Sequence, residues 1–220
     1  MSMRNEKVIV IGGSGGLGRA LCEKLNADYE IFALGSRDLD LTNREQVQKF
    51  FIEHDAEVII NLAGYNFDCL LHRYDTSTYI EMDKQIDVVV KGSVNLLNAC
   101  LPGMRSRGYG RIIFFSSILA AKPVIGTGVY AASKAFIEGL VKACAVENAS
   151  KGVTANAIQI GYFDGGLTHQ IPRPLQSSIL AGIPSGRFGS IDELENIIRF
   201  IINTEYINGS TLKVNGGAQF

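Results

Sequence analysis

The chain has 220 residues, of which 46% are hydrophobic and 20% are charged, and its formal net charge at pH 7 is -1. This composition fits a folded chain with a substantial core and excludes a disordered protein. A net charge this small gives no overall field for nucleic acid or an anionic membrane, so we expect neither as a partner. Four scattered cysteines and three scattered histidines predict reduced thiols and no metal site. No stretch resembles a signal peptide or a membrane span, which favours a cytoplasmic protein.

The first half of the chain alternates strand-like and helical patterns. KVIVI (Lys7–Ile11) is a β-branched run typical of a strand buried on both faces, and a glycine-rich turn then opens a helix. EIFAL (Glu30–Leu34) is the second predicted strand, and DLDLT (38–42) is expected to be a short third extended piece. A helix over about 43–54 and a strand over 57–64 follow.

The second half continues the alternation. We predict a helix over 76–104, a strand over Arg111–Ser117, a helix over Val129–Ser150, and then a strand, a helix and a strand over 152–160, 191–202 and 210–217. Strands separated by helices indicate right-handed crossovers. The sequence therefore predicts an α/β fold with a doubly wound, Rossmann-type parallel sheet and a single domain over residues 1–220.

The segment 162–187 is irregular and is the expected substrate loop. It carries five apolar side chains that either line a substrate pocket or simply pack, namely Leu167, Ile171, Leu175, Ile179 and Leu180.

IGGSGGLG, residues 11–18, is the first motif that carries chemistry. It follows a predicted buried strand and opens a helix, as a dinucleotide-binding turn does. Gly12 permits the tight turn, Gly16 lets the backbone approach a pyrophosphate, and Gly18 lets the helix pack closely. Ser14 and Leu17 belong to the same turn and are expected to contact the cofactor. The competing interpretation is a merely flexible connection between strand and helix.

GVYAASKAF, residues 128–136, raises a second question. Tyr130 and Lys134 are four residues apart and therefore share one helix face, whether that face packs or reacts. A phenol with an ordinary pKa of about 10 needs a neighbouring cation before its charged form is reached near neutral pH, and Lys134 can supply that charge. Taken alone, the pair fits either a packed aromatic beside a solvated lysine or an acid-base pair.

Several motifs in order make the chain similar to the short-chain dehydrogenase/reductase family over nearly its whole length. They are the glycine turn, NLAG at 61–64, the serine that ends RIIFFSS, YxxxK at 130–134, and the tail SGRFGS with INGSTLKVNGG. The tail most resembles the 3-oxoacyl-carrier-protein reductase branch. This resemblance implies a nicotinamide cofactor and hydride transfer to or from a carbonyl carbon.

The resemblance also assigns catalytic roles. Ser117 would hold the substrate oxygen, with Ser116 as its rival, and Tyr130 would donate the proton. Lys134 would bind the nicotinamide ribose and tune the phenol. Further cofactor contacts are implied for Asn61, Ala63, Gly64 and Gly161, which match NLAG and the glycine of the family's PGxxxT segment.

Cofactor choice depends on the end of the second predicted strand. Ser36 and Arg37 stand where an acidic residue would bind the ribose hydroxyls of NAD, and a hydroxyl with a fork-shaped cation suits a 2′-phosphate. This favours NADP over NAD, unless Arg37 merely pairs with Asp38. Asp40 matches the family's acid near the third strand and is assigned to adenine recognition.

One departure from the family pattern concerns function. Val89 stands where the family has an asparagine that holds a relay water, and Asn95 could replace it only if the helix changed register.

The leading interpretation is an NADP-dependent reductase of a 3-oxoacyl or related keto substrate, free or carrier-bound. The alternatives are a sugar-nucleotide or polyketide-type modifying reductase and a non-catalytic dinucleotide-binding protein. The long helices predict a homodimer or homotetramer.

Overall fold

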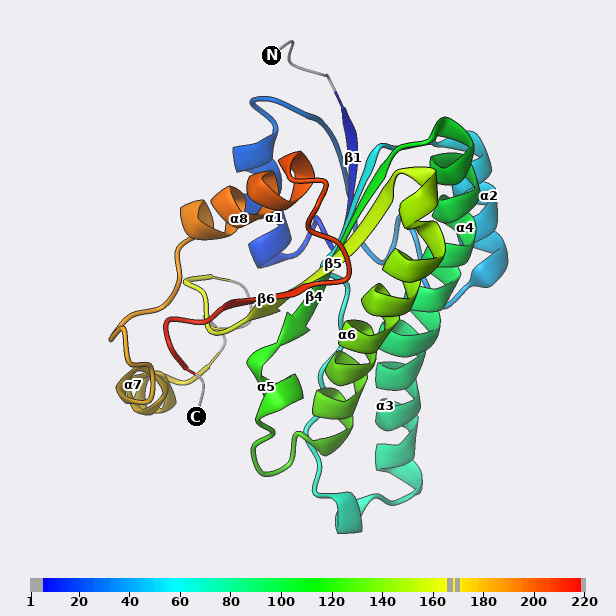
Figure 1. Ribbon diagram of the computed structural model, residues 1–220. Coiled ribbons are helices and arrows are strands. Elements are labelled where there is room, and N and C mark those ends of the chain that lie inside the picture. The colour runs from blue at the N-terminus through cyan, green and yellow to red at the C-terminus, as the bar shows by residue number, and fades with distance from the viewer. Residues whose placement is uncertain (1–5, 166–167, 169–170, 219–220) are drawn as a thin grey trace.

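A six-stranded, all-parallel sheet forms the centre of the computed structural model, which describes residues 6–165, 168 and 171–218 (Figure 1). The strands lie in the order β2-β1-β3-β4-β5-β6. Their bounds are Lys7–Ile11 (β1), Glu30–Leu34 (β2), Val58–Asn61 (β3), Gly110–Ser117 (β4), Val153–Ile160 (β5) and Thr211–Val214 (β6). The predicted α/β fold with a Rossmann-type sheet is thus confirmed.

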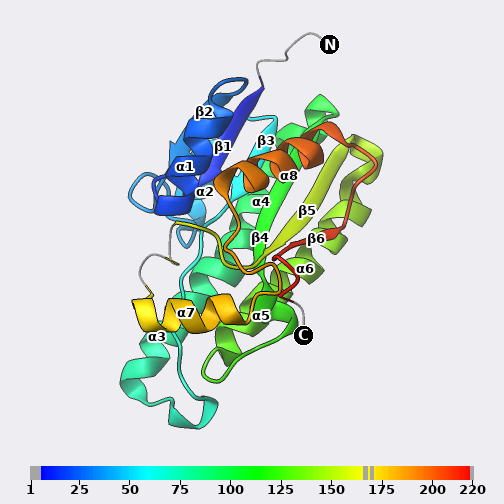
Figure 2. The ribbon, with the colours of Figure 1, turned by 90° about the vertical axis from the view of Figure 1, so that its left-hand side faces the viewer.

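Helices cover both faces of this sheet, as Figures 1 and 2 show. One face carries α1 (Gly16–Leu25) and α8 (Ile191–Asn203), which contact each other. The other face carries α2 (Arg44–Glu53), α4 (Gly92–Arg107) and α6 (Gly128–Asn148), with α3 (Thr76–Ile86) beside α6. Two shorter helices, α5 (Ile118–Ala121) and α7 (Arg173–Ala181), lie toward the carboxyl ends of the strands.

Alternation of side chains along the strands builds a separate core on each face. Ile9 and Ile11 of β1 belong to the cluster under α2, α4 and α6, whereas Val8 and Val10 belong to the cluster under α1 and α8. Successive strand residues point to opposite faces, so a continuous β-branched run is buried on both. This is why KVIVI carries no polar alternation.

The long helical region of the sequence is interrupted in its middle. Residues Asp87–Lys91 form a π-helix between α3 and α4, with the amide of Gly92 bonded to the carbonyl of Asp87. The helical region also runs past the predicted end at 104, to Arg107, where Gly108 closes it with a left-handed φ of 72°. Single π-helical turns inside helices often mark functional sites.

The prediction of a third extended piece at 38–42 was wrong as a strand. Leu39 and Leu41 are buried and Asp40 is exposed, so the segment alternates, but it pairs with no strand of the sheet among the described residues. A parallel partner for β2 needs a crossover of a dozen or more residues. A tight turn, in which the amides of Asp38 and Leu39 bond to the carbonyl of Gly35, replaces that crossover and leaves β2 at the edge.

The segment expected to be an irregular loop contains the helix α7. Pro172 caps it and Pro174 lies in its first turn, where proline is tolerated because the amides of that turn have no helical partner. Leu175, Ile179 and Leu180 therefore lie on a helix, and Leu175 is exposed. Leu167 lies outside the described residues, so the pocket predicted from these side chains stays a prediction.

Candidate active site

The glycine turn and NLAG meet at the point where the strand order reverses. β1 has β2 on one side and β3 on the other, and Ile11 is in register with Asn61. A Cβ added to Gly12, which has a φ of 79°, would lie 3.1 Å from the amide nitrogen of Ala63. Open α/β sheets bind ligands at such a switch point, outside the carboxyl ends of the strands.

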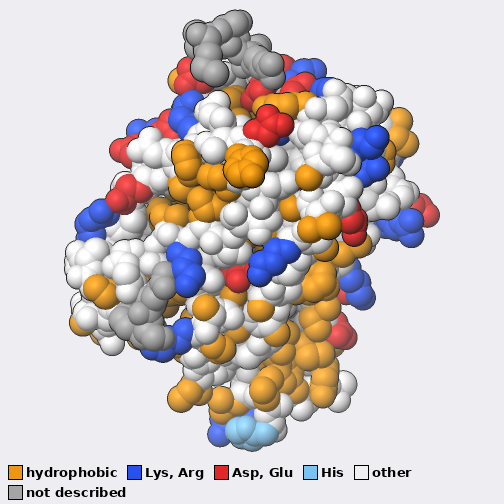
Figure 3. All heavy atoms as spheres, viewed as in Figure 1, with side chains coloured by type: hydrophobic (Ala, Val, Ile, Leu, Met, Phe, Trp, Pro, Cys, Tyr) orange, Lys and Arg blue, Asp and Glu red, His pale blue; other side chains and the backbone are white. Residues whose placement is uncertain are grey.

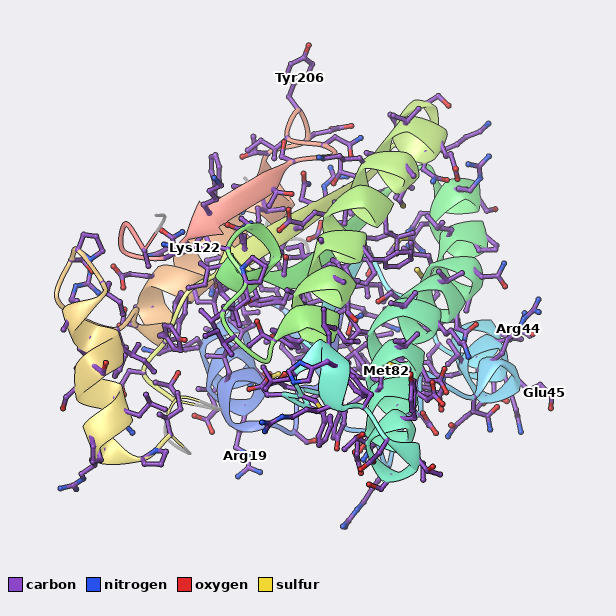
Figure 4. All side chains as sticks on the ribbon, turned by 90° about the horizontal axis from the view of Figure 1, so that it is seen from below. Arg19, Arg44, Glu45, Met82, Lys122 and Tyr206 are labelled. Carbon is purple, nitrogen blue, oxygen red and sulfur yellow. The ribbon has the colours of Figure 1, made fainter. Side chains whose placement is uncertain are left out.

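The turn fits a dinucleotide phosphate. A Cβ on Gly18 would collide with the carbonyl of Gly12, so only glycine lets α1 start so close to β1. Gly15 caps this helix without a side-chain hydrogen bond. The backbone amide of Arg19 donates the first hydrogen bond of the helix, to the carbonyl of Gly15. Among the described residues, the amides of the first turn, from Gly16 to Gly18, therefore have no side-chain acceptor, and they can bind an anion. Figure 4 shows the Arg19 side chain pointing outward from α1.

NLAG is shaped by its own asparagine. Asn61 is buried, and its side-chain oxygen accepts a hydrogen bond of 3.0 Å from the amide of Ala63. Gly64 follows on the exposed side of this turn, next to Lys134. Asn61 thus holds the loop, and Ala63 and Gly64 present backbone to the switch point.

The end of β2 presents Ser36 and Arg37 to solvent. No ion pair joins Asp38 and Arg37 in the described part of the chain, and the Asp38 carboxylate instead accepts the amide of Gly35 at 2.8 Å. Within the described part of the chain, Arg37 has no hydrogen bond or ion pair. The Ser14 hydroxyl lies against Gly35, where an added Cβ would collide with it. Because no described residue binds the Arg37 guanidinium, this group is available to bind an anion.

Asp40 is already engaged in a local turn. Its Oδ1 accepts hydrogen bonds from the amide and the hydroxyl of Thr42, at 2.9 and 2.8 Å. Its side chain is exposed, and its role in adenine recognition stays a prediction.

Ser117 and Tyr130 come together at the carboxyl end of β4. The Ser117 hydroxyl oxygen caps α5 by accepting the amide of Leu119 at 3.2 Å, and it also lies within hydrogen-bonding reach of the Tyr130 phenol. Burial raises the pKa of Tyr130 above its ordinary value of 10, and the hydrogen bond with Ser117 opposes part of that rise. The phenol is therefore kept protonated, as a proton donor must be.

Lys134 lies one turn further along α6 and is only 5% exposed. Its ammonium donates a hydrogen bond of 2.8 Å to the carbonyl of Phe115 and lies 5.8 Å from the centre of the Tyr130 ring. Burial lowers the pKa of Lys134 from 10.5 to about 8. Two of its three N–H donors remain for other partners.

Ser116, the rival of Ser117, points to the opposite face of β4. Its hydroxyl donates to Glu138 at 2.7 Å and lies 3.2 Å from the main-chain oxygen of Lys134. Gln159 of β5 donates to the same oxygen of Glu138 at 2.8 Å. The sequence analysis missed this network, which ties β4, β5 and α6 together one helical turn beyond Lys134.

The position of the expected relay residue is apolar. Val89 lies in the π-helix, is 1% exposed and packs in the same cluster as Ile137 of α6. Asn95, the expected substitute, donates its side-chain amide to the carbonyl of Leu41 at 2.9 Å. Val89 therefore offers no polar group for a relay water, and Asn95 is bonded toward Leu41 instead.

Gly161 directly follows β5 and lies near Ser117, since Ser117 and Ile160 are in register. A Cβ on Gly161 would lie 2.9 Å from the Cα of Asn215, which explains the glycine by packing. A cavity of about 60 Å³ lies beyond it, lined in part by Tyr162 and Asn215, and it is large enough to hold water.

Asp68 is a second residue that the sequence analysis missed. Its exposed carboxylate contributes to the raised pKa of both Tyr130 and Tyr162. The backbone brings it there, because the amide of Cys69 bonds to the carbonyl of Gly126, just before α6. The hydrogen bond between Cys69 and Gly126 joins segments almost 60 residues apart, so no residue spacing in the sequence predicts that Asp68 lies near Tyr130.

The family model described as "Enoyl-(Acyl carrier protein) reductase" matches residues 7–219. The acetoacetyl-CoA reductases of Shinella zoogloeoides and Rhizobium meliloti (strain 1021) are each 33% identical to the chain, over 96% of it and 98% of their own length. The 3-oxoacyl-(acyl-carrier-protein) reductase MabA of Mycobacterium tuberculosis (strain ATCC 25618 / H37Rv) is 29% identical, over 97% of this chain and 92% of its own.

The fold and site define a nicotinamide-dependent oxidoreductase of the Rossmann type. The chain belongs to the short-chain dehydrogenase/reductase family, close to the 3-oxoacyl-carrier-protein reductases, and is an NAD(P)-dependent enzyme of that family. Among the helices the structure describes, none is long and apolar enough to cross a membrane.

Proposed function

We propose that this protein is an NADP-dependent carbonyl reductase that converts a 3-oxoacyl or related keto substrate into an alcohol. The observation that carries the proposal is the meeting of Ser117, Tyr130 and the buried Lys134 at one end of β4. The names of the relatives, acetoacetyl-CoA reductase and 3-oxoacyl-carrier-protein reductase, support the same substrate class. We place the protein in the cytoplasm on the sequence evidence alone.

A bound nicotinamide would supply hydride to the carbonyl carbon. The Ser117 hydroxyl donates a hydrogen bond to the carbonyl oxygen, and Tyr130 gives that oxygen its phenolic proton. Lys134 stabilises the tyrosinate that remains, because an ammonium nearby favours the charged form. The same ammonium binds the nicotinamide ribose through its unused donors.

The first turn of α1 binds the pyrophosphate, and Arg37 with Ser36 binds the 2′-phosphate. The freedom of Arg37 from Asp38 supports this assignment. Ala63, Gly64 and Gly161 border the nicotinamide half, Asp40 binds adenine, and the loop 162–187 with α7 covers the substrate.

One observation favours a second function. The apolar surroundings of Val89 and the commitment of Asn95 to Leu41 remove the usual relay residue, as expected of a protein that binds a dinucleotide without turnover.

The test is fluorescence titration with NADPH and NADH, followed by turnover on β-ketoacyl thioesters and keto-sugars. Reduction of the thioesters supports the proposal, and reduction of keto-sugars alone shifts it to a sugar-modifying reductase. Tight NADPH binding with no turnover on any of these substrates would overturn the proposed substrate class and favour the non-catalytic alternative.

A further inference from the structure

Gln85 is a fully buried polar residue near the active site that the mechanism above does not use. It lies on α3 with an exposure of 0%, one helical turn before Val89. Its side-chain oxygen accepts a hydrogen bond of 2.7 Å from the amide of Phe67. Its side-chain nitrogen has no hydrogen-bond partner among the described residues.

Burying a carboxamide with an unpaired N–H costs stability, whereas an apolar side chain of similar volume would pack here without that cost. Val89, one turn along, shows that this helix does carry apolar side chains into the core. Stability of α3 therefore does not explain Gln85. Its hydrogen bond to a backbone amide 18 residues earlier in the chain is the specific contact to explain.

That amide belongs to the segment 64–69, which runs along the active site. At its start, a Cβ added to Gly64 would lie only 3.6 Å from the ammonium of Lys134. At its end, the amide of Cys69 is bonded to the carbonyl of Gly126 at 2.9 Å, next to the start of α6. Gln85 holds the middle of the segment, at Phe67.

We propose that Gln85 is a positioning residue of the active site, which fixes the segment 64–69 through the amide of Phe67 and so keeps the backbone of Gly64 against Lys134. The proposal rests on the reductase function proposed above. In that function, Gln85 makes a polar contact from α3 to the active-site segment, whereas the apolar Val89 makes none. Hydrogen bonds to its backbone hold the segment at Phe67, through Gln85, and at Cys69, through Gly126, while the Tyr65 side chain attaches it to α3 by donating to Glu81. Loss of the Gln85 bond therefore loosens the backbone at Phe67, between the Tyr65 and Cys69 contacts.

Two substitutions separate positioning from packing. Gln85→Met keeps the length and nearly the volume of the side chain but removes the acceptor, whereas Gln85→Glu keeps an oxygen acceptor for Phe67. Thr154→Val is the matched control, because Thr154 is 3% exposed, has a hydroxyl without a partner among the described residues, and lies at the start of β5, away from the site.

We expect Gln85→Met to lower kcat about tenfold, as loss of one buried hydrogen bond would, while the KM of the carbonyl substrate changes less than about twofold. Gln85→Glu should recover most of the loss, and Thr154→Val should match the unmodified protein. All proteins are compared well below their melting temperatures, so that global unfolding does not enter the result.

Amide hydrogen exchange gives a readout that needs no activity. Residues 64–69 should exchange about tenfold faster in Gln85→Met than in the unmodified protein, with little change in Gln85→Glu. If the unmodified protein reduces none of the substrates, the proposed function fails, while exchange still reports whether Gln85 holds the segment. Unchanged kcat and exchange in a folded Gln85→Met protein overturn the proposal. Failure of both Gln85 variants to fold also overturns it and assigns Gln85 to the core.

Discussion

The ammonium of Lys134 is bonded at 2.8 Å to the carbonyl of Phe115, two residues before Ser117 on the same strand. One strand thus supplies both the group that holds Lys134 and the hydroxyl that meets Tyr130. The helix face with tyrosine and lysine four residues apart is therefore set against the strand end. Lys134 is buried there and not solvated, while the acid-base role of the pair stays a prediction.

Lys134→Met should stabilise the cofactor-free protein at pH 7. Burial lowers the folded pKa of Lys134 from 10.5 to about 8, so the unfolded chain binds more protons between these values. The resulting destabilisation is complete below pH 8 and disappears as the pH rises through 10.5. Removing the charge should raise the free energy of unfolding at pH 7 by on the order of 2 kcal/mol, after about 1 kcal/mol is lost with the Phe115 hydrogen bond.

Urea denaturation at pH 7 and pH 10 measures this difference. Lys142→Met, an exposed position on the same helix, is the control and should change little. A Lys134→Met protein that is less stable at pH 7, or equally stabilised at both pH values, would show that burial of the charge is not costly here.

Tyr130→Phe should abolish reduction while leaving NADPH affinity nearly unchanged, because only the proton donor is lost and the ring still packs. General acid catalysis contributes about a hundred- to ten-thousand-fold, so turnover should fall by more than about two orders of magnitude. Turnover, fluorescence titration and melting temperature are measured together. Tyr206→Phe, at a fully exposed tyrosine, is the control. Full activity in a folded Tyr130→Phe protein would remove the tyrosine from the chemistry.

NADPH should bind more tightly than NADH, and Arg37→Ala should reduce that preference. A charge-assisted pair between the guanidinium and the 2′-phosphate is worth about 1.5 to 3 kcal/mol, or roughly ten- to a hundredfold in affinity. Arg44→Ala is the control, since Arg44 also lies exposed but at the start of α2, where it points outward in Figure 4. Equal affinities of the unmodified protein for the two cofactors would refute the assignment.

The protein should form a dimer or tetramer with two-fold symmetry. Large hydrophobic side chains are exposed on the helical face opposite α1 and α8, among them Ile80 of α3, Val94 of α4 and Val146 of α6. Figure 3 shows hydrophobic surface gathered on the lower part of the molecule, over α3 and α6. Such a surface marks an interaction site, and most oligomers of identical chains are closed and symmetric.

Light scattering at micromolar concentration measures the assembly. Ile80→Lys should dissociate the assembly. Ile52→Lys should not, although Ile52 is also an exposed isoleucine, because it lies on α2. A monomer in the unmodified protein would contradict the prediction.

Sequence patterns were sufficient wherever a short local rule applies. KVIVI, the glycine turn and the spacing of Tyr130 and Lys134 each fix a local shape, and the structure joins these shapes at the carboxyl edge of the sheet. What the sequence could not show are contacts between distant segments. Asp68 with Tyr130 and Gln159 with Glu138 depend on tertiary packing, to which residue spacing gives no access. The helix α7 was missed for a local reason, because the two prolines at its start concealed a helical pattern.

Val89→Asn should leave turnover unchanged or raise it, at a cost in stability. Val89 is 1% exposed among apolar neighbours, and an amide placed there without partners should lower the free energy of unfolding by about 1 to 3 kcal/mol. The π-helix keeps this position beside α6, so a polar side chain at 89 faces the helix that carries Lys134. If a missing relay limits the rate, the new amide can hold a water there and the rate rises. If proton supply is not limiting, turnover stays the same while the melting temperature falls.

Val90→Asn is the control, because it introduces the same amide at the next, half-buried position of the π-helix. It should leave turnover unchanged and cost less stability, since a half-buried amide can reach solvent. Turnover is measured well below both melting temperatures, so that folding losses do not enter the rate. A fall in turnover in Val89→Asn but not in Val90→Asn would mean that the apolar contact at Val89 itself supports catalysis, by holding α6 and therefore Lys134 in place.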